Sequence, residues 1–200
     1  KRANIYNNGI RAQILWREDE LNTGDLLMVA KNNYYWTEKS KEMDFIANGE
    51  IAVLRRLRRT RELYGFRFAE VLLAFPDYGD FELEVNLLLD TLHTDAPALP
   101  KADNDRLFYA VLEDYADISM KRERMKKMKV DPHYNALQVK YAYAVTCHKA
   151  QGGQWKNVFL DQGYMTDEYL TPDYFRWLYT AFTRATGTLY LVNYPKEQIL

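Results

Sequence analysis

A polar segment that follows an apolar stretch carries several side chains able to bind phosphate or ribose. Thr146, His148 and Lys149 offer a hydroxyl, an imidazole and an ammonium group, and each can contact a phosphate oxygen. The glycines at 152–153 let backbone amides approach a ligand closely. Gln154 adds an amide that can hydrogen-bond a ribose hydroxyl. By this chemistry alone, the segment fits either a ligand-binding turn or an ordinary loop.

A second segment places one arginine among small and apolar residues. Arg184 follows the run 178–183 and precedes Ala185. Its guanidinium group is a fixed planar cation that can neutralise charge on a phosphate. The alternative is a salt-bridged arginine at the end of a helix. Arg176, nearby, has no comparable setting, and we expect it to be a surface charge.

The composition fits a globular chain with its own core. The 200 residues are 48% hydrophobic, which suffices for one or two domains. The sequence has no apolar stretch of about 18 residues, so we predict no membrane partner. The single cysteine, Cys147, excludes an internal disulfide and fits a reducing compartment, so we predict a cytoplasmic protein. His93, His133 and His148 lie far apart in the sequence, and we predict no metal site.

The net charge of −1 hides two basic clusters. The first holds five arginines within residues 55–61, and the second holds six cations against Glu123 within Lys121–Lys129. Each cluster is either a nucleic-acid contact, favoured by counterion release, or a solvated face. The arginines of the first cluster are Arg55, Arg56, Arg58, Arg59 and Arg61.

Hydrophobic periodicity predicts an α/β chain with a β-rich insertion. Residues Ala3–Leu15 are expected to form either a helix with a weak centre or a helix that ends near Gly9, and Leu26–Ala30 a buried strand. Three β-prone segments punctuated by turn residues then predict an antiparallel meander. A helix starting at Asp103 or Asn104 should run through the basic stretch and stop before Pro132. The meander strands are Ile51–Leu57, Phe66–Phe75 and Phe81–Leu89; the later elements are strands at Val139–Val145, Val158–Leu160 and Leu189–Val192 and a helix at Tyr174–Arg184.

The order Thr146-x-His148-Lys-x-Gln-Gly152 closely resembles motif V of the superfamily 1 helicases. In that family the early threonine and histidine lie against single-stranded DNA, and the segment after the glycine faces the nucleotide. Many members have a glutamate at the position of Gln154. Because the glutamine side chain is neutral, the resemblance implies no role in metal binding or charge coupling for this residue. The implied DNA-binding residues are Thr146, His148 and Lys149, and the implied nucleotide-binding residues are Gly152, Gly153, Gln154 and Arg184.

The run Tyr179–Ala185 resembles motif VI of the same family, which implies that Arg184 is the catalytic arginine finger. The beginning of the chain, Asn4–Asn7 with Ile10-Arg11, resembles the end of motif IV. Arg11 is therefore either a phosphate contact or a solvated helix charge. The sequence has no Gly-x-x-x-x-Gly-Lys-[Ser/Thr] phosphate-binding loop, and we expect Asp161 to be structural although it ends an apolar strand.

The β-prone insertion favours the RecD-like branch, which moves 5′ to 3′ along single-stranded DNA. Asn48–Val53 resembles the entry to the SH3-like barrel of that branch, whereas the UvrD-like branch has a longer helical insertion. The resemblance implies an α/β fold: a P-loop-NTPase-like (second RecA-like) domain with an inserted small SH3-like β-barrel. The expected segments are the first part of the RecA-like domain at 1–44, the barrel at 45–96, a helical connection at 97–132, and the return with both motifs at 133–200.

The resemblance to the C-terminal part of a superfamily 1 DNA helicase, with a UvrD-like helicase C-terminal domain, implies a set of partners. They are single-stranded DNA, an upstream ATP-binding RecA-like domain of the same chain, and a nuclease or repair protein. ATP and Mg²⁺ would be cofactors of the full-length protein, and this chain, read as an excised fragment, would bind neither alone and would not hydrolyse ATP. The alternatives are a non-catalytic helicase-like module that binds DNA or protein, or a subunit of a helicase–nuclease complex in repair or recombination.

Overall fold

The computed structural model describes residues 1–163, 168 and 170–194. The chain forms two compact units, Lys1–Ala144 and Val145–Leu200, and each is described by itself. The last predicted segment, 133–200, includes residues 164–167, 169 and 195–200, which lie outside the described residues. No helix within the described ranges is both long and apolar enough to cross a membrane.

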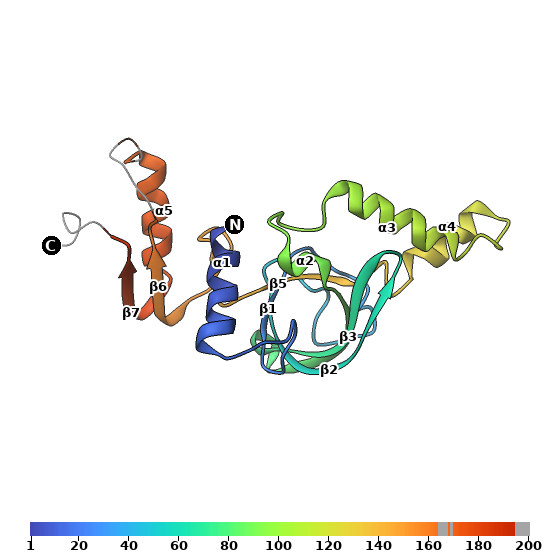
Figure 1. Ribbon diagram of the computed structural model, residues 1–200, viewed down its shortest axis with the longest axis horizontal. Helices are drawn as coiled ribbons and strands as arrows, with labels where there is room; N and C mark the ends of the chain where they lie inside the picture. The colour runs from blue at the N-terminus through green and yellow to red at the C-terminus, as the bar shows by residue number, and fades with distance from the viewer. Residues whose placement is uncertain (164–167, 169, 195–200) are drawn as a thin grey trace. The chain divides into compact units, whose positions relative to one another are not determined.

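The first unit is built around a closed five-stranded barrel (Figure 1). The strands follow one another around the barrel in sequence order, and the barrel closes where β5 pairs with β1. All pairings are antiparallel except that of β4 with β5. The strands are β1 (Leu26–Val29), β2 (Ile51–Leu63), β3 (Phe66–Phe75), β4 (Phe81–Leu88) and β5 (Leu137–Tyr141).

The predicted meander is confirmed as β2, β3 and β4. The two-residue turn Tyr64-Gly65 has φ of 59° and 68°, the left-handed pair that a tight hairpin requires. A short 3-10 turn, η2 (Pro76–Tyr78), connects β3 to β4. The apolar runs that predicted β1 and β5 do form strands, but they pair in the barrel and not in an α/β sheet. A continuous apolar run predicts burial without saying which sheet buries it.

A buried ion-pair network joins the first helix to the barrel. Helix α1 (Arg2–Gly9) continues without interruption into the π-helical turn η1 (Ile10–Ile14), which carries Arg11. The Arg11 guanidinium donates to both carboxylate oxygens of Asp25, each at 3.1 Å, and it lies 4.2 Å from the ring centroid of Tyr141. Arg17 and the Tyr143 hydroxyl donate to the same carboxylate, at 2.6 and 2.7 Å.

This network corrects both interpretations of Arg11. Its side chain is neither a phosphate contact nor a solvated charge, because only 6% of the residue is exposed and Asp25 is fully buried. Burying two charges is costly unless they are paired and hydrogen-bonded, and the network supplies both conditions. Asn7 adds a second tie, donating to the carbonyls of Tyr141 and Ala144 at 3.0 and 2.9 Å.

Acid is expected to weaken the first unit through Asp25. Burial alone would raise the pKa of this carboxyl, but hydrogen bonds, led by the one from Arg11, outweigh burial and hold the pKa below its ordinary value of 3.8. A depressed pKa stabilises the fold above the unfolded-state pKa, and this stability is lost as the pH falls through the folded-state pKa. The free energy of unfolding, measured in urea across pH 2 to 6, should therefore fall below about pH 4. Asp25→Asn should remove much of this fall, and an unchanged profile in Asp25→Asn would contradict the assignment.

A helical excursion leaves the barrel after β4 and returns at β5. It contains α2 (Asp90–His93), α3 (Lys101–Glu113) and α4 (Lys121–Lys129), which Figure 1 shows in green to yellow. The single long helix expected here is wrong, because the chain turns between α3 and α4. Arg124 satisfies the carbonyls in that turn by donating to Ala116 and Ile118. Both helices pack on the barrel through a second apolar cluster that includes Phe66, Phe68, Leu107, Val111 and Met128.

The second unit contains a strand, a helix and a parallel strand. β6 (Trp155–Asp161) pairs in parallel with β7 (Ala185–Val192), and α5 (Pro172–Phe182) connects them. The Thr171 hydroxyl accepts the Tyr174 N–H at the start of α5, and Pro172 occupies the first turn, where its missing N–H costs nothing. The three predicted elements are confirmed, although α5 ends two residues before Arg184 and β7 begins directly after it.

Candidate functional site

The motif V segment forms a compact turn in the second unit. The Thr146 carbonyl accepts the N–H groups of Lys149 and Ala150, at 2.9 and 3.1 Å, and Ala150 is buried beneath the turn. The side chains of Thr146 and His148 are exposed, whereas Lys149 is half-buried. Two of the three predicted DNA-binding side chains are therefore accessible to a ligand on one short turn.

A cysteine that sequence reasoning did not place in the site anchors this turn. The Cys147 thiol lies 3.6 Å from the Trp177 carbonyl of α5 and donates to it. Burial raises the pKa of the Cys147 thiol, and the positive charge of Arg184 opposes part of that rise. Cys147 thus packs as a neutral thiol within the electrostatic reach of Arg184. The only sequence signal was its position inside the motif.

The two glycines after the turn are required for different reasons. Gly152 has φ of 88°, a left-handed conformation that side chains disfavour. A Cβ on Gly153 would lie 2.4 Å from the Trp155 indole, which packs over the glycine. Gly153 therefore allows the backbone to pass close to the Trp155 indole, and Gly152 allows the chain to turn just before it.

Arg184 is held by backbone carbonyls and a hydroxyl. Nε donates to the Thr180 carbonyl at 3.0 Å, Nη1 to the Gly153 carbonyl at 2.9 Å and Nη2 to the Thr183 hydroxyl at 3.0 Å. Within the described ranges the guanidinium has no carboxylate partner, so the salt-bridged alternative is not what the structure shows. Among the described residues, three of its five N–H donors are used, and no carboxylate there neutralises its positive charge.

Hydrogen bonds between described residues join the two motif segments. Besides the bond from Arg184 to Gly153, the Trp155 N–H donates to the Arg184 carbonyl at 2.9 Å, and Gln154 Nε2 donates to the Thr183 carbonyl at 3.3 Å. The structure therefore brings together Gly153, Gln154 and Arg184, three of the predicted nucleotide-binding residues, where β6 and β7 begin. Thr183 was not predicted as a site residue, yet its carbonyl accepts from Gln154 and its hydroxyl accepts from Arg184.

Other candidate positions have structural explanations. Asp161 Oδ1 accepts the Gly163 N–H and the Asn193 amide, each at 2.9 Å, which supports the structural assignment. Arg176 is exposed and paired with Asp173 at 2.7 Å, as expected of a surface charge. Among the described residues no group of three metal-ligating side chains occurs.

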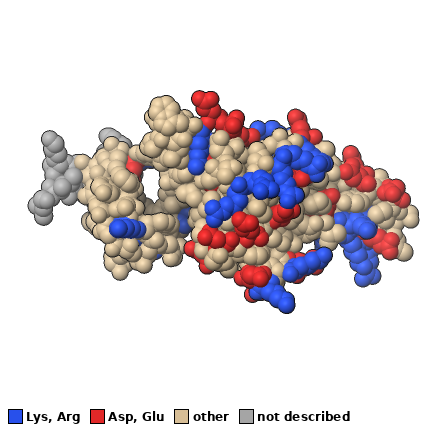
Figure 2. All heavy atoms as spheres, turned by 90° about the horizontal axis from the view of Figure 1, so that it is seen from below, with Lys and Arg blue, Asp and Glu red and all other residues tan. Residues whose placement is uncertain are grey.

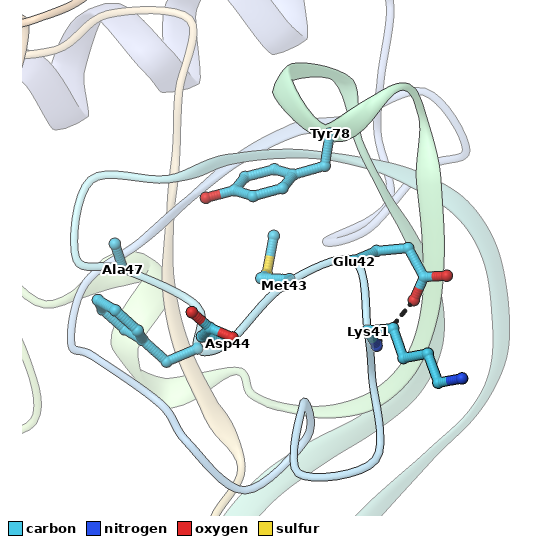
Figure 3. Close-up of a pocket in the computed structure, with 7 residues that line it drawn as sticks. Lys41, Glu42, Met43, Asp44, Ala47 and Tyr78 are labelled. Carbon is cyan, nitrogen blue, oxygen red and sulfur yellow. Dashed lines mark hydrogen bonds between the residues drawn. The ribbon is translucent and has the colours of Figure 1, made fainter.

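A hollow in the first unit is separate from these residues. Its volume is about 280 Å³, and residues on the loop 41–47 line it together with Tyr78 (Figure 3). Glu42 accepts the Lys41 backbone N–H at its rim. None of the predicted site residues lines this hollow.

The match to a known family covers the segment that holds both motifs. Residues 141–192 match the UvrD-like helicase C-terminal domain. The matched segment begins at the last residue of β5 and ends at the last residue of β7, so it includes the motif V turn, α5 and Arg184. The match supports a UvrD-like helicase C-terminal region in this chain. No curated protein matches the chain.

Proposed function

We propose that the chain is the C-terminal portion of an ATP-dependent DNA helicase or translocase. In this proposal Arg184 is the arginine finger, and Thr146, His148 and Lys149 contact single-stranded DNA. One observation carries the proposal: Arg184, which has no carboxylate partner among the described residues, is hydrogen-bonded directly to the glycine segment that follows the motif V turn. A cation placed there can respond to a nucleotide and transmit that response to the turn.

The hydrogen bonds of Arg184 suggest how coupling proceeds. An arriving γ-phosphate competes for the guanidinium with the carbonyls of Gly153 and Thr180, and charge-assisted bonds to phosphate are stronger than bonds to neutral carbonyls. Loss of the bond to Gly153 frees the segment 152–154 to shift. The Thr146 turn lies immediately before that segment, so its contacts with DNA change in the same step.

We propose that the phosphate-binding loop comes from outside these 200 residues, since the sequence has no Gly-x-x-x-x-Gly-Lys-[Ser/Thr]. We propose that a RecA-like ATP-binding domain of the same protein holds ATP and Mg²⁺ and that the present residues complete the site. Gly152, Gly153 and Gln154 would then face the nucleotide. The 200 residues alone are proposed to be inactive as an ATPase.

The barrel supports the RecD-like branch as the closer relationship. The five closed strands fit the SH3-like barrel that the resemblance implies between motifs IV and V. Movement from 5′ to 3′ is part of this proposal and depends on that branch. Translocation on single-stranded DNA with a fluorescent label at either end would test it, since arrival at the 5′ end alone contradicts the branch.

Removing the exposed polar groups of the motif V turn is expected to weaken binding of single-stranded DNA. Thr146→Ala combined with His148→Ala deletes a hydroxyl and an imidazole, and lost neutral hydrogen bonds of this kind cost about 0.5–1.5 kcal/mol each. Affinity of the intact protein for an oligonucleotide should fall about 5- to 100-fold, measured by fluorescence anisotropy at several salt concentrations.

The matched control is Thr186→Ala, which removes an exposed hydroxyl from β7 in the same unit. It should leave DNA affinity unchanged. Equal affinities for wild type and the double variant at every salt concentration would refute the assigned DNA contact.

A further inference from the structure

Helix α4 packs against the first unit on one side and carries basic side chains on another. Met128 is buried, and Met125 and Arg124 are half-buried, so this side faces the body of the first unit. Arg122, Lys126 and Lys129 are exposed, and their spacing of four and three residues aligns them along one side of the helix. This basic stripe is about 10 Å long, from the rise of 1.5 Å per residue.

The arginines of β2 provide a contrast, because acidic residues on neighbouring strands and in the turn before β4 pair with four of them. Figure 2 shows basic and acidic side chains interleaved over the first unit. The arginine cluster is therefore largely a ladder of cross-strand ion pairs. The pairs are Arg55 with Asp80 at 3.1 Å, Arg58 with Glu84, Arg59 with Glu70 at 2.6 Å, and Arg61 with Glu70 at 3.7 Å.

The cations of the basic stripe have no such partners among the described residues. In the part of the chain that the structure describes, no carboxylate forms an ion pair with Arg122, Lys126 or Lys129. Of the acids near the helix in sequence, Asp114 accepts the Tyr64 hydroxyl at 2.5 Å and Asp131 accepts the Tyr115 hydroxyl at 2.8 Å. Asp117 and Glu123 are exposed, and within the described ranges neither forms an ion pair with the stripe. The positive charge of the stripe is thus available to an external anion.

Helix stability explains only part of this charge distribution. Cations in the last turn of a helix complement its dipole, and this accounts for Lys126 and Lys129. Lys121 and Arg122 occupy the first turn, where a cation opposes the dipole and disfavours the helix. The helix dipole therefore does not account for Lys121 and Arg122, although Glu123 in the same turn offsets part of their charge.

We propose that Arg122, Lys126 and Lys129 bind the phosphate backbone of single-stranded DNA, forming a contact on the helical excursion in addition to the motif V turn. The choice of DNA as the polyanion rests on the proposed function. A stripe of exposed cations without base-reading groups gives sequence-independent affinity through counterion release. This contact would hold the strand through the first unit independently of nucleotide state.

The test measures oligonucleotide affinity of the intact protein against salt concentration for Arg122→Gln/Lys126→Gln/Lys129→Gln. Each phosphate contact contributes a slope of about −0.7 to log K against log salt for a single strand. Loss of three contacts should make the slope less negative by about 2. The ratio of wild-type to variant affinity for the oligonucleotide should therefore shrink about 20-fold between 50 and 200 mM salt. The control, Arg55→Gln/Arg58→Gln/Arg59→Gln, removes the same charge from the ion-pair ladder and should keep the wild-type slope.

The outcomes distinguish the proposed DNA contact on α4 from the proposed ATPase function. The proposed DNA contact of the stripe is contradicted if the α4 variant keeps the wild-type slope, or if the control variant shows the same flattening. Either result contradicts it even where the motif V double variant still loses affinity. A flattened slope for the α4 variant alone supports the stripe, and it does so even if the protein hydrolyses no ATP, a result that would count against the proposed function. Tighter binding of polyglutamate than of the oligonucleotide would overturn DNA as the partner.

Discussion

Arg184→Ala is expected to abolish DNA-stimulated ATP hydrolysis by the intact protein while nucleotide binding stays detectable. An arginine finger supplies about 10³- to 10⁵-fold in turnover by neutralising charge that develops on the transferred phosphoryl group. The structure adds a second reason, because the guanidinium also bonds Gly153, Thr180 and Thr183 at the junction of the two motifs. Steady-state turnover with saturating single-stranded DNA, and binding of a fluorescent ATP analogue, measure the two parts.

Three further variants separate charge from architecture. Arg184→Lys keeps a cation but cannot make three bonds in one plane, so turnover should stay low. Thr183→Ala keeps the guanidinium and removes one partner, so the loss should be far smaller. Arg176→Ala removes an exposed arginine from the same region and should leave turnover unchanged. Turnover of Arg184→Ala near that of wild type would remove Arg184 from the mechanism.

Asp25→Ala is expected to destabilise the first unit by about 3–5 kcal/mol, since it leaves a buried guanidinium without its counter-charge. Asp25 is fully buried and accepts hydrogen bonds from Arg11, Arg17 and Tyr143. Such a loss is a large fraction of a typical domain's stability of about 5–15 kcal/mol. The midpoint of urea unfolding, followed by tryptophan fluorescence, measures it.

An exposed ion pair in the same unit provides the control. Asp80→Ala breaks the surface pair with Arg55 and should cost about 1 kcal/mol or less. Combining Arg11→Ala with Asp25→Ala should cost less than the sum of the single changes, because the double variant no longer buries a lone charge. Equal midpoints for Asp25→Ala and Asp80→Ala would contradict a stabilising role for the buried network.

Features set by neighbouring residues could be predicted from the sequence. The turn Tyr64-Gly65 placed the β2–β3 hairpin because its conformation is local. The helix and strands around Arg184 were likewise found from periodicity. By contrast, the membership of β1 and β5 in the barrel depends on pairing between residues more than a hundred positions apart, such as Leu27 with Tyr141. Hydrophobic pattern carries no information about that partner.

In the candidate site, too, the sequence located residues but not the partners that the fold brings to them. Motif resemblance located Arg184 and the turn at Thr146, but the atoms that hold the guanidinium are mainly backbone carbonyls, which no side-chain pattern reveals. Arg11 was misjudged for a related reason. Its helix is mostly polar, and only the fold brings Asp25 and Tyr141 around the guanidinium to bury it.

We propose that these residues complete a DNA-dependent ATPase. ATP hydrolysis by the intact protein, measured with and without single-stranded DNA, tests this proposal. The proposal predicts hydrolysis that rises when the oligonucleotide is added, with the rise reduced in the Thr146→Ala/His148→Ala variant. Absence of hydrolysis at every concentration of DNA, from folded protein that still binds the oligonucleotide, would contradict the claim and favour a non-catalytic binding module.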